Sequence, residues 1–179
     1  MTVALLPRRE RHRSYVNAAA VLATVFVIVA AWPSRGLVVA LLIAWSVTAI
    51  VAAAIDVRTG RLLNVIVLPA SLLVLGLAFR AGRLDGALLG ALLLGLPMLV
   101  AHSARPDGLG FGDVKFGIFI GAGIGVVAVP LVLPAYLLAA VAHAGTCVVR
   151  RARGGLVPFG PALAGASILT IVAELLRRL

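Results

Sequence analysis

The sequence predicts an all-α protein built as a polytopic bundle of about seven membrane-spanning helices. Hydrophobic residues make up 63% of the 179-residue chain and its mean hydropathy is +1.16, whereas a soluble domain is only about 45–50% apolar. Only 12% of the residues are charged. Apolar runs of roughly the 20 residues that cross a bilayer follow one another along the chain. Lipid is the solvent that accepts so much apolar surface, so one membrane domain is expected.

The lengths of the apolar runs predict seven spans. We place them at about Tyr15–Trp32, Gly36–Ile55, Leu62–Phe79, Gly86–His102, Phe116–Val129, Leu131–Val149 and Leu156–Leu176. The chain then divides into a basic cytoplasmic tail at residues 1–14 and one membrane-embedded domain at residues 15–179. Pro130 and Pro134 separate the fifth and sixth spans. One kinked helix in their place would be too long for a bilayer, so two helices are expected.

The first span has one feature of a secretory signal peptide, because several arginines precede its apolar stretch. However, Trp32 and Pro33 follow it directly, and the next span begins at Gly36. This arrangement favours a helix that is retained over one that is cleaved off.

The distribution of basic residues predicts the orientation of the chain. With the N-terminus in the cytoplasm, eleven of the 16 Lys and Arg residues fall on the cytoplasmic side. The other five are Arg35, Arg80, Arg83, Arg177 and Arg178. Cytoplasmic loops carry an excess of Lys and Arg, so we expect a multi-pass protein of the inner or plasma membrane with an external C-terminus. Basic residues scattered among such loops do not form a phosphate-binding face, and nucleic acid is not an expected partner despite the net charge of +10.

The fifth span carries Gly117, Gly121 and Gly125 at four-residue spacing. Glycines on one face of a helix let two backbones approach closely, which matters in lipid because burial of apolar surface does not drive helices together there. The fifth helix is therefore expected in the interior of the bundle.

Two of the six acidic residues are candidates for chemistry. Asp56 and Asp113 each lie where an expected cytoplasmic loop meets a hydrophobic helix, and a carboxylate there is costly unless it is hydrated or paired. Facing each other, one carboxylate acts as general base on a water while its protonated partner hydrogen-bonds the substrate carbonyl. Charge placement alone leaves a second interpretation open, in which Asp56 pairs with Arg58 or Arg61 and Asp113 with Lys115. The remaining acidic residues are expected to be surface charges: Glu10, Asp85, Asp107 and Glu174.

Three short motifs separate these interpretations. Residues 110–115 read G-F-G-D-V-K, residues 56–64 read D-V-R-T-G-R-L-L-N, and residues 157–163 read V-P-F-G-P-A-L. In this order they resemble the G-x-G-D-x-K, D-x-R-(x)3-I-P-N and P-[FY]-G-P-[AF]-L elements of the type IV prepilin peptidases. The resemblance covers about two-thirds of the chain, and three elements in family order are far more specific than a lone G-x-G-D.

The resemblance implies an integral-membrane aspartyl endopeptidase that removes class III signal peptides from prepilins or pseudopilins at the cytoplasmic face of the membrane. It implies Asp56 and Asp113 as the catalytic pair. It also implies four neighbouring residues: Gly110, Gly112, Lys115 and Asn64. The two glycines would give the loop backbone freedom, and the two polar side chains would support the site. No cofactor is implied, and the chain has no cysteine cluster or His-x-x-x-His pair to hold a metal.

Some residues depart from the family pattern. Leu63 replaces the usual proline before Asn64, which loosens a turn and removes no reactive group. Because Cys147 is the only cysteine, the chain resembles the shorter peptidase-only branch, with the first helix added to a six-helix core. Presenilin-like proteases share G-x-G-D and P-A-L but carry Tyr-Asp at the first aspartate, where this chain has Ile55-Asp56.

Two alternatives from other classes remain at this point: a catalytically inactive membrane scaffold of a pilus or secretion assembly, and a small cation-coupled transporter that uses the two carboxylates. His102 and His143 lie in or at the end of apolar runs, where a hydrogen bond between helices is favoured over a proton relay.

Overall fold

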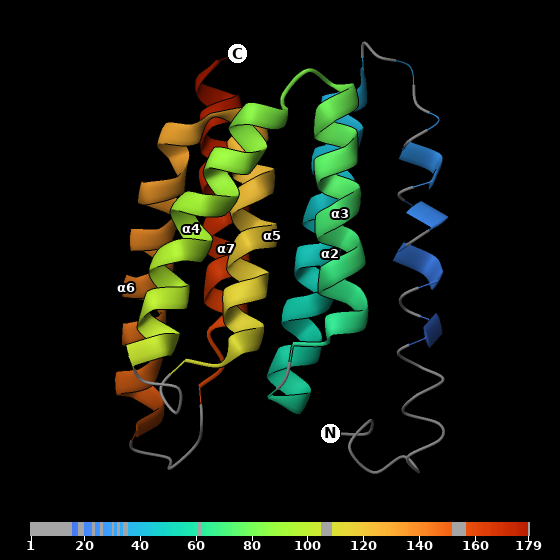
Figure 1. Ribbon diagram of the computed structural model, residues 1–179. Helices are drawn as coiled ribbons and strands as arrows, with labels where there is room; N and C mark the ends of the chain where they lie inside the picture. Colours follow the sequence, from blue (N-terminus) through green and yellow to red (C-terminus); the bar gives the residue numbers. More distant parts are fainter. Residues whose placement is uncertain are drawn as a thin grey trace.

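The computed structural model describes residues 36–60, 62–104, 109–151 and 157–178, together with scattered positions between residues 16 and 33. The ordered elements within these ranges are six α-helices and one short 3-10 helix, without a strand, and they form the bundle shown in Figure 1. The predicted all-α class is confirmed. The basic tail at residues 1–14 and most of the expected first span Tyr15–Trp32 lie outside the described residues.

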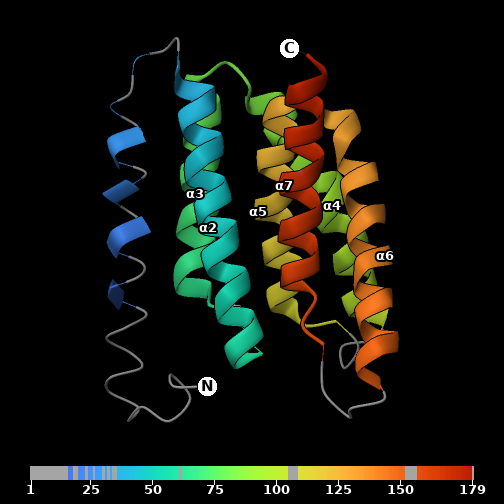
Figure 2. The same cartoon turned by 180° about the vertical axis from the view of Figure 1, so that it is seen from behind.

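The helices alternate in direction. They are α2 (Leu37–Thr59), α3 (Asn64–Arg80), α4 (Leu84–Ala104), α5 (Phe111–Val127), α6 (Val132–Arg151) and α7 (Gly160–Arg177), with the 3-10 helix η3 (Val129–Leu131) before α6. The last turns of α2, α4 and α6 therefore meet the first turns of α3, α5 and α7 at one end of the bundle (Figures 1 and 2). We call it the lower end, after its place in Figure 1, and the opposite end the upper end.

Two helix boundaries correct the sequence-based placement of the aspartates. α2 continues beyond the expected end at Ile55 as far as Thr59, where Gly60 stops it with a left-handed φ of 62°. Glycine adopts that conformation without steric cost. α5 begins at Phe111 rather than at Phe116. Both aspartates consequently lie within the terminal turns of their helices, close to the connections as expected.

Four of the described helices are long and apolar enough to cross a membrane: α2, α4, α7, and α6 together with η3 over Val129–Val149. α3 and α5 have 17 residues each. At 1.5 Å per residue such a helix is about 25 Å long, which is the lower limit for a span. Large apolar side chains on the outer faces, such as Leu72 and Val141, are more than 70% exposed and suit contact with lipid.

α5 is the central helix of the bundle, and it buries 12 of its 17 residues: Val114, Phe116, Gly117, Phe119, Ile120, Gly121, Ala122, Gly123, Ile124, Gly125, Val126 and Val127. Its most extensive contact is with α4, where Gly121 and Gly125 face Gly90 and Gly86 so closely that a Cβ on any of the four would overlap the opposite backbone. The interior position predicted from the glycine spacing is confirmed.

Trp45 fixes α2 against α5. Its side chain is fully buried, it lies where a side chain on Gly123 would have to be, and its Nε1 donates a 3.1 Å hydrogen bond to the carbonyl oxygen of Phe119. The indole N–H of a buried tryptophan needs such a partner. This contact holds together the two helices that carry the aspartates.

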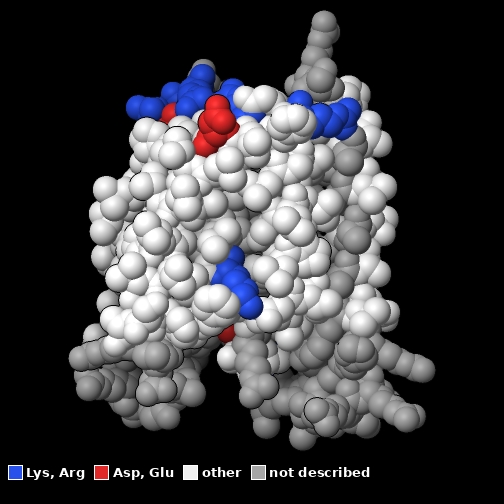
Figure 3. All heavy atoms as spheres, in the orientation of Figure 1, with Lys and Arg blue, Asp and Glu red and all other residues white. Residues whose placement is uncertain are grey.

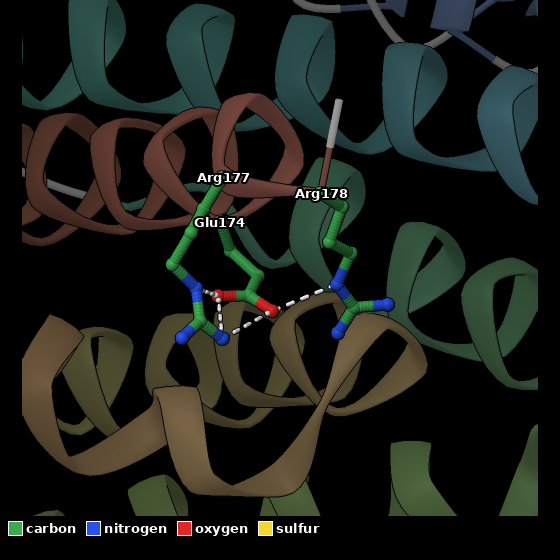
Figure 4. A network of polar contacts seen from close by, with 3 residues as sticks. All are labelled: Glu174, Arg177 and Arg178. Atoms are coloured by element: carbon green, nitrogen blue, oxygen red, sulfur yellow. Dashed lines mark hydrogen bonds and ion pairs between the residues drawn. The ribbon is translucent and has the colours of Figure 1, made fainter.

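The upper end carries a small charged cluster. Glu174 of α7 accepts hydrogen bonds from Arg177 and Arg178, with ion-pair distances of 2.9 and 2.7 Å (Figure 4). Basic side chains gather along this edge of the molecule in Figure 3. Although expected as a surface charge, Glu174 has a side chain that is only 9% exposed, whereas the paired Arg177 and Arg178 are more than half exposed.

Candidate active site

Asp56 is the more deeply buried of the two candidate aspartates. It lies in the last turn of α2 and is 4% exposed. Its Oδ2 accepts a 3.2 Å hydrogen bond from the backbone N–H of Gly160, the first residue of α7. The first N–H groups of a helix have no partner within the helix, and their partial positive charge favours a carboxylate. Asp56 thus supplies a hydrogen-bond acceptor for the first N–H group of a helix that begins 104 residues later in the chain.

Asp113 lies in the first turn of α5, three residues after the N-cap Gly110. The backbone N–H of Asp113 donates a 3.0 Å hydrogen bond to the carbonyl oxygen of Gly110, and the carboxylate interacts with the backbone of Gly110 in return. A side chain at the third helical position that reaches back to the N-cap is half of a capping box. The G-x-G-D motif therefore folds as the start of a helix with its carboxylate at the lower end.

The structure brings Asp56 and Asp113 together from separate helices, close enough for their charges to repel one another. The ion pairs within the described part of the chain both involve Glu174 at the upper end. Among the described residues, Asp56 therefore forms no ion pair with Arg58, and Asp113 forms none with Lys115. The other expected partner of Asp56, Arg61, lies outside the described residues. Two interacting carboxylates lose their protons in two steps, which is the property needed for one to act as base while the other keeps a proton.

Gly110 and Gly112 differ from the expectation of unusual backbone freedom. Gly110 has an ordinary φ of −66°, and the described glycines with positive φ are Gly60 and Gly82. What matters is the missing side chain. A Cβ on Gly110 would lie 3.2 Å from Oδ2 of Asp113, and one on Gly112 would lie 3.3 Å from the Cβ of Leu62 in the α2–α3 connection. The two glycines let the first turn of α5 sit tightly beside its neighbours.

Lys115 and Asn64 lie together at the edge of the site. Nζ of Lys115 donates a 3.0 Å hydrogen bond to Oδ1 of Asn64 and lies 4.6 Å from the centre of the Phe111 ring. Asn64 opens α3 after Leu63, whose extended backbone serves as N-cap although it replaces the usual proline. The lysine therefore ties the start of α3 to the first turn of α5.

The two histidines bond within or beside their own helices, and not between helices as expected. Nδ1 of His102 lies 2.7 Å from the carbonyl oxygen of Leu109 in the α4–α5 connection. Nε2 of His143 lies 3.4 Å from Sγ of Cys147, one turn along α6. Among the described residues, no group of three or more His, Cys, Asp and Glu side chains is placed to hold a metal ion.

Sequence reasoning missed the contact between Asp56 and Gly160. It used the V-P-F-G-P-A-L motif only as a family signature, because none of these side chains is reactive. A glycine at the start of a helix is common, and it identifies neither the hydrogen bond nor its partner Asp56.

The family model described as the type IV leader peptidase family matches residues 40–148, more than half of the chain. The match includes both aspartates and ends before Gly160. It confirms the resemblance seen in the motifs. No curated protein and no solved structure matches the chain.

Proposed function

The chain belongs to the type IV leader peptidase family, a family of multi-pass membrane peptidases, and we propose that it is an aspartyl endopeptidase that cleaves the class III signal peptide of prepilins or pseudopilins. The observation that carries the proposal is that Asp56 and Asp113 interact electrostatically. They lie in the last turn of α2 and the first turn of α5, two helix ends at the lower end of the bundle (Figure 1). We further propose that this lower end faces the cytoplasm. The excess of Lys and Arg in the loops expected on that side supports this orientation.

The proposed reaction uses the two carboxylates in opposite protonation states. The ionised aspartate takes a proton from a water molecule while the protonated one donates a hydrogen bond to the carbonyl oxygen of the scissile peptide. The water oxygen bonds to the carbonyl carbon and forms a tetrahedral intermediate. A proton then passes to the amide nitrogen, the C–N bond breaks, and the products are a free carboxyl group and a new N-terminal amine.

The position of the pair suits a substrate that is itself a membrane helix. Asp56 lies in the last turn of α2 and Asp113 in the first turn of α5, so both carboxylates lie near the ends of apolar helices and not at their middle. A leader peptide is cut just before a hydrophobic segment. With that segment in the lipid beside the bundle, its cleavage site would lie at the depth of the aspartates.

The test is cleavage of a prepilin from the same genome by purified protein in detergent or vesicles, followed by mass measurement of the products. Asp56→Asn and Asp113→Asn should each lower kcat/KM by at least about 100-fold, the smaller end of what a general acid or base contributes. Asp85→Asn is the matched control, because Asp85 lies in the first turn of α4 at the upper end, and it should retain activity.

Substantial cleavage by either asparagine variant would refute the assignment of the pair. A wild-type chain that cleaves no prepilin, yet is required for pilus assembly with or without its aspartates, would identify a scaffold. Aspartate-dependent uptake of a cation by vesicles would identify a transporter.

A further inference from the structure

We infer that Gly160 is a positioning residue for Asp56, through its backbone N–H and through its lack of a side chain. The inference rests on the proposed function only in assigning Asp56 to the cleaving pair. The contact itself joins the last turn of α2 to the first turn of α7.

The hydrogen bond orients the carboxylate. Within the described part of the chain, the N–H of Gly160 is the donor that reaches the carboxylate of Asp56, at 3.2 Å from Oδ2. With Oδ2 held in this way, rotation of the carboxylate is restricted, and this bond does not occupy Oδ1. When a reacting group is already held in one orientation, less conformational entropy is lost on reaching the transition state, and the barrier is lower.

The missing side chain is equally important. A Cβ at position 160 would lie 2.7 Å from Oδ2 and 3.4 Å from Cγ of Asp56. Ordinary contacts begin at 3.4 Å, so the carboxylate would have to move by about 0.7 Å, the difference between 3.4 and 2.7 Å. Buried as it is, Asp56 has little room in which to retreat.

The start of α7 is braced in this position. Phe159, the N-cap of α7, packs edge-on against the ring of His143 of α6, with ring centres 5.1 Å apart. Pro161 follows Gly160 in the first turn, where its fixed φ suits a helix and its missing N–H costs nothing. The N–H of Gly160 is therefore presented to Asp56 by a rigid turn. This turn lies beyond residue 148, where the family match ends.

The first test compares Gly160→Ala with Gly165→Ala. Both add one methyl group to α7, but a Cβ at position 165 meets nothing within 4 Å. We expect Gly160→Ala to lower kcat by about 100-fold, as a displacement near 1 Å does, with KM within about twofold because uniform binding is unaffected. Gly165→Ala should match the wild type. Equal kcat for the two variants, or an effect of Gly160→Ala on KM alone, would overturn the inference.

The second test does not depend on activity and uses an Asp56→Ala background. There the clashing Oδ2 and Cγ are gone, and the nearest remaining atom, Cβ of residue 56, would lie at an ordinary 3.6 Å. Gly160→Ala should lower the midpoint of thermal unfolding of the wild-type chain by at least about 2–4 °C and leave that of Asp56→Ala unchanged. If Gly160→Ala alone does not fold, the double variant should.

These outcomes separate the inference from the proposed function. Equal destabilisation in both backgrounds, or a double variant that also fails to fold, would show that the two residues do not meet and would overturn the inference. A wild-type chain that cleaves no prepilin would refute the proposed function, while the coupling between positions 56 and 160 would still be measured.

Discussion

Replacing Gly121 with alanine should push α5 away from α4 and lower the stability of the bundle. A Cβ at this position would overlap the carbonyl oxygen of Gly90 and would lie 2.8 Å from its carbonyl carbon and 2.9 Å from the Cβ of Leu94. Because ordinary contacts begin at 3.4 Å, the helices would have to separate by at least about 0.6 Å to clear the carbonyl carbon, the difference between 3.4 and 2.8 Å, and by more to clear the oxygen. The obstacle is backbone, which cannot rotate away as a side chain does.

Overpacking of this kind lowers the free energy of unfolding by about 1–3 kcal/mol. For a chain of this size, each kcal/mol lowers Tm by about 2–4 °C. The control is Gly76→Ala in α3, where an added Cβ meets nothing within 4 Å. Alanine favours a helix over glycine by roughly 0.5–1 kcal/mol, so the control should be neutral or more stable.

The assay is thermal unfolding of both purified variants in the same detergent, followed by circular dichroism, with cleavage measured in parallel. Since α5 also carries Asp113, Gly121→Ala should lose activity as well as stability. Equal Tm values for the two variants would refute the close approach of α4 and α5. A destabilised but fully active Gly121→Ala variant would show that the packing above the site does not set the position of Asp113.

Two further predictions follow from the same geometry. The pH profile of the cleavage rate should be bell-shaped, because the proposed mechanism requires one aspartate ionised and the other protonated. A rate that rises or falls with pH without a maximum would argue against a shared proton. Reporter fusions after Arg83 and at Leu179 should read as external, and fusions after Arg58 and Arg151 as cytoplasmic; a cytoplasmic C-terminus would mean that the number of spans is even.

The order and number of the described helices were predictable because a membrane segment is recognised by its length and apolarity alone. Their packing faces were not, because the lipid-facing and the buried sides of such a helix are both apolar. Leu72 is exposed and Trp45 is buried, yet nothing in the local pattern distinguishes their sides. Glycine was the exception. The spacing of Gly117, Gly121 and Gly125 predicted that α5 packs inside the bundle, since glycine marks close approach of two backbones.

The aspartates were predictable because carboxylates are rare in apolar segments, but their setting was not. The expected end of the second span was placed before Asp56, at the first charge. The helix instead continues until Gly60 supplies the left-handed residue that ends it. The role inferred for Gly160 was beyond the sequence for a different reason. Its hydrogen bond uses a backbone N–H, which every residue except proline carries, so residue type gives no hint of the bond.

The absence of ion pairs at Asp56 and Asp113 among the described residues has a chemical consequence. A contacting guanidinium or ammonium would favour the ionised form of either carboxylate strongly, and a pair that must keep one proton would then lose it. Here each carboxylate instead meets the backbone of a glycine at the start of a helix, Gly160 for Asp56 and Gly110 for Asp113. Such a backbone contact orients an oxygen while adding only the partial charge of a helix end. In the proposed mechanism, helix starts would therefore hold both aspartates in place without fixing which of them carries the proton.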